Sequence, residues 1–147
     1  MSTLECSSKG NKNFSALYAK VTIKGKTQSI ENWYQLSKCF TGKRPKSFNQ
    51  AKHIQHRGYK PTSIFIFDKE YDIKYLTAWY ELLWVKYLDK HPELVEIAKQ
   101  YDNFSDMFRN KNTINCQADI IRDYVQKGRK YIIEKHSEFI ELLREDD

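Results

Sequence analysis

An uninterrupted helical pattern of large apolar side chains between Leu76 and Leu88 constrains the fold more than any other feature. Seven residues recur at spacings of three and four, so an α-helix would place them all on one face: Leu76, Trp79, Tyr80, Leu83, Trp84, Tyr87 and Leu88. Burying that face would contribute about 1.5–3 kcal/mol per large side chain. The aromatic rings would also suit stacking on nucleobases, but this spacing is more typical of a core helix. We therefore expect residues 76–88 to form the helix on which the domain packs.

A second amphipathic helix is predicted over residues 29–40, with Ser29 as its N-cap and Glu31 in its first turn. One face carries an apolar stripe of Ile30, Trp33, Tyr34, Ser37 and Phe40. Beside this stripe, a carboxylate, an amide and an ammonium group are in line at i, i+4 and i+7, namely Glu31, Gln35 and Lys38. Polar groups in line beside aromatic rings suit a polar ligand that carries a ring. The simpler interpretation is the solvated edge of a surface helix.

The remaining patterns predict a chain that is mixed but mainly helical. Two short strands are expected, at 17–23 and 63–67. Residues 68–72 are turn-like, and 102–113 is a polar segment that forms either a short helix or a loop. Further helices are expected at 47–57, 93–101, 115–127 and 130–143. We therefore expect an α+β fold that is predominantly α, with one compact domain over 13–144, a few short strands and a flexible N-terminus over 1–12.

Composition limits the classes of protein to which the chain can belong. Its 147 residues carry a net charge of +6, which permits contact with phosphates or nucleic acid without requiring it. Three widely spaced cysteines, Cys6, Cys39 and Cys116, form no CxxC motif, which argues for a reducing compartment and against a disulfide framework or a zinc cluster. The sequence has no apolar run of transmembrane length and no signal-peptide core. We therefore expect a cytoplasmic protein that does not bind a membrane.

Basic residues are concentrated between Lys43 and Lys60. Eight of these eighteen positions are lysine, arginine or histidine: Lys43, Arg44, Lys46, Lys52, His53, His56, Arg57 and Lys60. Such a cluster either holds phosphate oxygens, with Arg57 as one candidate, or is a solvated charged loop. No acidic or cysteine ligand lies near His53 and His56 in the sequence, so no metal site is predicted. The sequence also lacks the Walker A, dinucleotide-binding, serine-hydrolase and zinc-protease motifs.

Residues 20–40, KVTIKGKTQSIENWYQLSKCF, resemble the corresponding segment of the NADAR/YbiA-like proteins. In that family a strand and a Gly-Lys turn lead into a helix with the pattern Glu-aromatic-aromatic-Gln-x-x-Lys-Phe. The matching residues here are Glu31, Trp33, Tyr34, Gln35, Lys38 and, displaced by one position, Phe40. Phe14-Ser15 is similar to the start of the family's Phe-Ser-Asn-Phe segment, and Asn115 precedes a C-terminal helix as it does there. The resemblance is best over residues 13–40 and looser elsewhere.

The sequence departs from that family at two places. The family's Ser-Asn-Phe is Ser15-Ala16-Leu17 here, so its asparagine is missing. A Trp-Gly-x-Gly stretch before the last helix is replaced by FSDMFRNKNTIN over residues 104–115, which contains no glycine. Both departures therefore affect the expected active site more than the expected fold.

The resemblance implies an N-glycosidase that hydrolyses an N-ribosyl bond in an ADP-ribosyl adduct or a nucleotide intermediate without a cofactor. Cleaving this bond develops positive charge on the ribose, which a nearby carboxylate stabilises. The first candidate for that carboxylate is Glu31, and the weaker candidates are Asp102, Asp106 and Asp119. The residues expected to bind the substrate, a nucleotide or another ADP-ribose-type small molecule, are Ser15, Trp33, Tyr34, Lys38, Arg57 and Asn115.

Two other functions are compatible with the same sequence. A catalytically inactive relative would bind a nucleotide or nucleic acid through the basic segment, and its binding would be sensitive to salt. A protein-interaction module would instead use its aromatic surface to bind a partner. The glycosidase hypothesis alone predicts that Glu31→Gln abolishes turnover while the fold stays intact.

Overall fold

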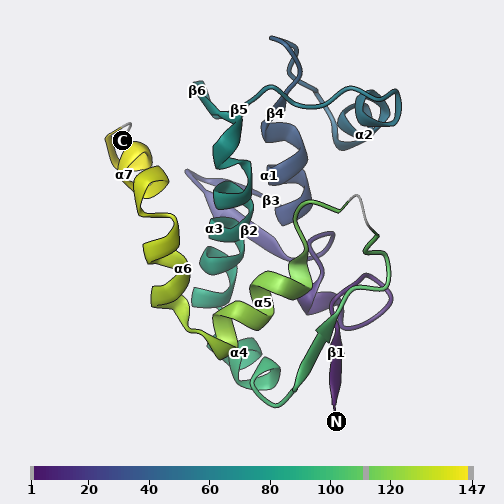
Figure 1. The fold of residues 1–147 in the computed structure, drawn as a ribbon, viewed down its shortest axis with the longest axis vertical. Helices are drawn as coiled ribbons and strands as arrows, with labels where there is room; N and C mark the ends of the chain where they lie inside the picture. Colours follow the sequence, from purple (N-terminus) through teal and green to yellow (C-terminus); the bar gives the residue numbers. More distant parts are fainter. Residues whose placement is uncertain (1, 111–112, 146–147) are drawn as a thin grey trace.

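The computed structural model describes residues 2–110 and 113–145. Its strands are β1 (Thr3–Glu5), β2 (Lys20–Ile23), β3 (Lys26–Ser29), β4 (Lys38–Cys39), β5 (Ser63–Ile66), β6 (Lys69–Asp72) and β7 (Asn103–Ser105). Its α-helices are α1 (Ile30–Ser37), α2 (Phe48–His56), α3 (Leu76–Asp89), α4 (Pro92–Ala98), α5 (Gln117–Gln126), α6 (Arg129–Lys135) and α7 (Ser137–Glu145). Short 3₁₀ turns lie at Lys12–Phe14 and Ile73–Tyr75. The predicted α+β class with mainly helical content is confirmed (Figure 1).

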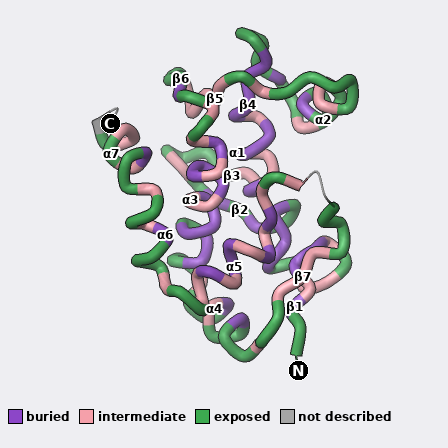
Figure 2. The backbone as a smooth tube through the Cα atoms, viewed as in Figure 1, coloured by how far each residue is buried: buried purple, intermediate pink, exposed green. Residues whose placement is uncertain are grey.

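Helix α3 is the packing centre of the domain, as its apolar spacing predicted. All seven residues of the stripe are buried, and Leu83 and Trp84 have no exposed surface. Helices α1, α4, α5 and α6 and strand β2 all contact α3. Figure 2 shows the buried backbone running through α1, α3 and α5, whereas α2 and the outer helices are largely exposed. The core is therefore a helical one, and the small sheets lie around it.

The strands form three small sheets. Strands β2 and β3 form an antiparallel hairpin in which Lys20 pairs with Ser29, so the predicted strand and its return before α1 are both present. Strands β4, β5 and β6 form a second antiparallel sheet in that order. The expectation of a turn over 68–72 was wrong, because Lys69–Asp72 pairs with β5 across a two-residue loop. Phe67 begins that loop at a φ of 55°, a conformation that the local sequence does not signal.

Helix α1 begins where the sequence predicted and ends earlier. The Ser29 hydroxyl accepts a hydrogen bond from the Asn32 amide at 3.0 Å, which confirms the expected N-cap. The helix ends at Ser37, and Lys38 and Cys39 turn into strand β4, which pairs with Ile64 and Ser63. The predicted end at residue 40 was wrong because strand pairing with a distant segment competes with the helical spacing.

The stretch over 1–12, expected to be flexible, contains a strand. Strand β1 pairs in parallel with β7, so that Leu4 faces Phe104 across the register. The Leu4 side chain is buried, and the Glu5 carboxylate accepts hydrogen bonds from the Ser105 hydroxyl at 2.6 Å and the Met107 amide at 2.9 Å. The segment 102–113, expected to be a short helix or a loop, thereby supplies a strand. Parallel pairing across about a hundred residues leaves no local signal in the sequence.

The C-terminal part differs from the expected single helix over 130–143. Helices α6 and α7 meet at His136, whose Nε2 lies 2.7 Å from Glu81 Oε1 on α3. The Lys135 ammonium also lies 3.0 Å from the same carboxylate oxygen. The contacts of Lys135 and His136 with Glu81 on α3 therefore lie at the break between α6 and α7. Among the described residues, no helix has the length and apolarity needed to cross a membrane.

Replacing Leu4 with alanine tests whether β1 is a structural part of the domain. Because Leu4 is 3% exposed, we expect Leu4→Ala to lower the free energy of unfolding by about 2–5 kcal/mol. Chemical denaturation measures this change. The matched control is Leu17→Ala, at a position that is 49% exposed, and it should alter stability by less than about 0.5 kcal/mol. Equal effects of the two substitutions would contradict the packing of β1.

Candidate active site

A chain of hydrogen bonds joins the polar side chains of α1 to helix α2. The Lys38 ammonium donates to Gln55 Oε1 at 2.8 Å, and Gln55 Nε2 donates to Gln35 Oε1 at 2.9 Å. Gln35 Nε2 in turn donates to Glu31 Oε1 at 2.8 Å. Gln35 and Lys38 are both buried, so these bonds satisfy groups that would otherwise be costly to desolvate. The predicted polar stripe is therefore an internal network that orients Glu31, and not a solvated edge.

Tyr34 lies beneath this network. The Asn115 side-chain amide donates to the Tyr34 hydroxyl at 2.8 Å, and the Lys38 ammonium lies 4.4 Å from the centre of the Tyr34 ring. Burial raises the pKa of Tyr34 to about 12; the Glu31 charge acts in the same direction and the Asn115 hydrogen bond opposes it. Tyr34 is therefore a neutral hydroxyl at physiological pH. The structure thus brings together four residues that the sequence proposed, namely Glu31, Tyr34, Lys38 and Asn115.

The segment before β2 and the segment after β7 form the other wall beside Glu31. Gln117 connects the two segments, because its Oε1 accepts from the Ala16 amide at 2.6 Å and its Nε2 donates to Asp106 Oδ2 at 2.9 Å. The Glu31 amide also donates to the Ala16 carbonyl at 3.0 Å. A cavity of about 330 Å³ lies between these groups, lined by Ser8, Ser15, Ala16, Leu17, Glu31, Phe48, Lys52, Asp106, Phe108 and Gln117.

A second cavity of about 450 Å³ adjoins the first along α1. Gln35, Lys52, Gln55, His56, Asn110 and Thr113 line it. Lys52 lines both cavities, and Glu31 and Gln35 are one helical turn apart. We call the two cavities together the α1 groove. Figure 1 shows α2 and the green segment that leads to α5 on the same side of α1. Residues of both segments line the groove.

Several residues proposed from the sequence lie outside the α1 groove. Asp102 is exposed at the start of β7, where its carbonyl accepts a hydrogen bond from Gln126 at 3.5 Å. Trp33 is on the other face of α1, and its Nε1 donates to the Val21 carbonyl at 2.9 Å. Arg57 follows α2, with its guanidinium 6.0 Å from the ring of Tyr59. Asp119 is paired with Arg109 at 2.9 Å.

Two groove residues were missed by sequence reasoning, and each has an identifiable reason. Gln55 and Gln117 act through hydrogen bonds to residues 20 and 101 positions away in the sequence. Neither belongs to a recognisable motif, so only the folded arrangement identifies them. Of the basic segment, Lys52 and His56 line the groove. Among the described residues, no three His, Cys, Asp or Glu side chains are grouped as metal ligands would be.

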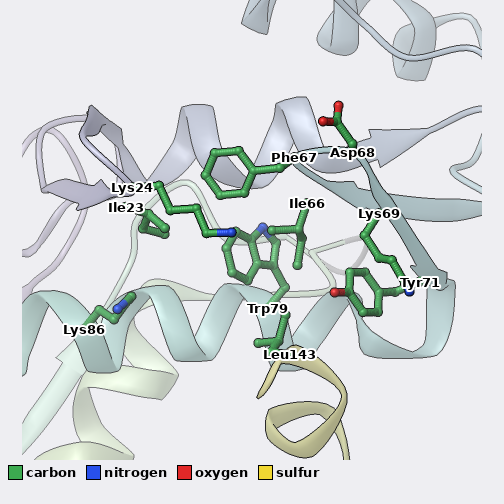
Figure 3. Close-up of a pocket in the computed structure, with 10 residues that line it drawn as sticks. All are labelled: Ile23, Lys24, Ile66, Phe67, Asp68, Lys69, Tyr71, Trp79, Lys86 and Leu143. Carbon is green, nitrogen blue, oxygen red and sulfur yellow. The ribbon is translucent and has the colours of Figure 1, made fainter. Parts of the chain in front are cut away.

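The largest cavity lies elsewhere, between α3, α7 and the two hairpin turns, with a volume of about 710 Å³ (Figure 3). Its walls include Ile66, Phe67 and Trp79, and the Lys24 ammonium lies 5.1 Å from the centre of the Phe67 ring. Asp68 is the one carboxylate among the ten described residues that line it, and Figure 3 shows it pointing away from the cavity. Lysines and large apolar side chains line this cavity, and no amide side chain is among its ten described lining residues. We therefore place the candidate site at α1, where a carboxylate and amides are joined by hydrogen bonds.

The described lining of the groove combines two carboxylates, several amides and the Lys52 ammonium group, which suits a sugar joined to phosphate. The model of the NADAR-DarT1 family, described as DarT1-associated NADAR antitoxin, matches residues 1–147, so the chain belongs to that family. The resemblance to NADAR proteins noted in the sequence is thereby confirmed. Comparison with curated proteins found no match.

Lys38 makes the hydrogen-bonded network beside the groove sensitive to pH. Burial lowers the pKa of Lys38 to about 8, although the Glu31 charge acts in the opposite direction. Because the pKa is lower in the folded than in the unfolded chain, the folded state binds fewer protons between pH 8 and 10.5, and stability rises with pH across this range. We expect the wild type to gain about 3 kcal/mol relative to Lys38→Met over this range.

Chemical denaturation of both proteins at several pH values measures the gain. Lys86→Met removes an exposed lysine of α3 and controls for the change in net charge. A difference between wild type and Lys38→Met that stays constant from pH 7 to 10.5 would contradict the lowered pKa of the buried Lys38 ammonium.

Proposed function

We propose that this protein is an N-glycosidase that removes ADP-ribose from a nucleobase and so reverses the kind of adduct left by an ADP-ribosylating toxin. The observation that carries the proposal is the chain of hydrogen bonds from Lys38 through Gln55 and Gln35 to Glu31. It holds one carboxylate in a fixed orientation at the wall of a cavity. The family name, which describes antitoxins associated with DarT1, supports a substrate connected with a toxin.

Hydrolysis breaks the bond between the ribose C1′ and the base nitrogen and joins a water oxygen to C1′. The transition state carries positive charge on the ribose ring. Glu31 stabilises this charge or accepts the proton of the attacking water, and the base leaves with a proton. A preoriented carboxylate is effective in this role because it needs no rearrangement as the charge develops.

The residues in and beside the groove suit the remainder of an ADP-ribosyl group. The Gln117 amide, which lines the cavity with Glu31, would bind a ribose hydroxyl. Asn115, which lies beside the groove on the Tyr34 hydroxyl, would bind the sugar as the family resemblance implies. Lys52 and His56 line the adjoining cavity and would hold phosphate oxygens beside the basic α2 segment. Asp106 lines the same cavity as Glu31 and is the second candidate carboxylate. Ser15 is buried at the groove wall, within reach of the same ligand.

The substitution Glu31→Gln tests this function directly. Since it removes the negative charge and keeps the shape, we expect turnover to fall at least about 100-fold while the fold stays intact. Mass spectrometry would follow the release of free base or sugar phosphate from ADP-ribosylated guanosine, ADP-ribosylated DNA, free ADP-ribose and phosphoribosylamino-pyrimidines. Asp102→Asn, on an exposed carboxylate outside the groove, is the matched control and should retain wild-type activity.

A binding protein without catalysis is the second candidate, favoured by Ala16 at the place of the family's asparagine and by the basic α2 segment. It would release no product from any of these substrates. Its binding of a nucleotide or nucleic acid would weaken with salt and in Arg57→Ala, and would barely change in Glu31→Gln.

A further inference from the structure

The large cavity of about 710 Å³ combines ammonium groups with an apolar lining. Its ammonium groups belong to Lys24, Lys69 and Lys86, and Asp68, the one carboxylate among its ten described lining residues, points away from it (Figure 3). Lysine donates hydrogen bonds and accepts none. The remaining lining residues are large and apolar or aromatic: Ile23, Ile66, Phe67, Tyr71, Trp79 and Leu143. By charge and polarity, the molecule that complements this cavity has an anionic group joined to an apolar body.

Two of the lining residues have a backbone conformation that their side chains disfavour. Lys24 and Phe67 each begin a two-residue hairpin loop, and their φ angles are 51° and 55°. Glycine or asparagine is the usual residue at a positive φ in such loops, and a bulky side chain is uncommon there. The Lys24 ammonium lies 5.1 Å from the centre of the Phe67 ring, so the two turns bring these side chains together. Unfavourable backbone conformations occur often at ligand sites, which favours a binding role for both side chains.

The aromatic part of the lining is held against helix α1. The Trp79 indole donates to the Trp33 carbonyl at 3.5 Å, and the Trp33 and Phe67 rings meet edge to face with their centroids 5.9 Å apart. Trp33 is itself buried in α1. Phe67 and Trp79 therefore have fixed positions in the cavity wall. Fixed rings favour an aromatic occupant, because aromatic pairs gain from edge-to-face or offset contact beyond the burial of their area.

We propose that the large cavity binds an aromatic carboxylate, with the ring of the ligand against Phe67 and Trp79 and its carboxylate held by the ammonium groups of Lys24 and Lys86. The described residues that line this cavity include none of those that line the α1 groove, so the inference is independent of the proposed function. A ligand rich in hydroxyl groups suits this cavity poorly, because no amide side chain is among its ten described lining residues.

Titration with 1-naphthaleneacetate tests this site, and 1-naphthaleneacetamide is the matched probe that keeps the ring and lacks the charge. NMR would follow the Trp79 indole of the labelled protein. We expect the carboxylate to shift this signal and to leave the side-chain amides of Gln35, Gln55 and Gln117 unchanged. The acetamide should bind at least about tenfold more weakly, since it forms no charge-assisted hydrogen bond with lysine. Equal affinity of the two probes, or no shift of the Trp79 indole, would overturn the proposal.

Lys24→Asn removes one ammonium group and suits the fold. Lys24 and Gly25 both have a positive φ, as a type I′ turn requires, and Asn-Gly is a preferred sequence for that turn. We expect this variant to be at least as stable as the wild type in chemical denaturation and to raise the Kd for 1-naphthaleneacetate about tenfold. Lys86→Met, at an exposed position of α3, should also raise the Kd and tests the site without changing a turn.

The matched control is Lys9→Asn, which removes the same charge from an exposed turn outside the cavity lining and should leave the Kd unchanged. Equal losses in Lys9→Asn and Lys24→Asn would indicate an effect of net charge alone and contradict the site. An unchanged Kd in both Lys24→Asn and Lys86→Met would contradict it as well.

Inorganic pyrophosphate supplies an anion without an apolar body. We expect it to leave the Trp79 indole unchanged at concentrations where 1-naphthaleneacetate saturates the shift. If pyrophosphate displaces 1-naphthaleneacetate at an equal concentration, the lysines bind anions without regard to a ring, and the proposal of an aromatic ligand is wrong.

Discussion

The burial of helix α1 on nearly all sides is the constraint on which the site depends. None of its eight residues is exposed, yet it carries Glu31 and Gln35 and is followed directly by the buried Lys38. Polar groups in such a position must be hydrogen-bonded within the protein, since an unpaired buried group costs several kcal/mol. Gln55 on α2 meets that requirement, so the packing of α2 on α1 and the orientation of Glu31 arise from the same hydrogen bonds.

The two faces of α1 also divide the molecule into two regions with different chemistry. Trp33 lines a small separate cavity with Phe67 and Trp79, whereas Glu31 and Gln35 face the groove. On this side of α1, the Asn115 amide donates to the Tyr34 hydroxyl and Asp106 lines the groove. Both residues lie in the stretch whose sequence departs from the family pattern.

The parts of the fold that local sequence determines were predictable, and the parts that distant pairing determines were not. The α3 stripe and the Ser29 cap are local, and both are confirmed. Strand β1, strand β6 and the break between α6 and α7 depend on partners elsewhere in the chain. The same division holds for the site, since the spacing of Glu31, Gln35 and Lys38 was visible but their link through Gln55 was not.

NMR mapping with ADP-ribose tests the central claim, that the α1 groove is the ligand site, most directly. Side-chain amides of Gln35, Gln55 and Gln117 report on the α1 groove, and the Trp79 indole reports on the large cavity. The account predicts that ADP-ribose shifts the groove amides and leaves the Trp79 indole unchanged. Shifts confined to the Trp79 indole and its neighbours would contradict it and place the ligand on the other face of α1.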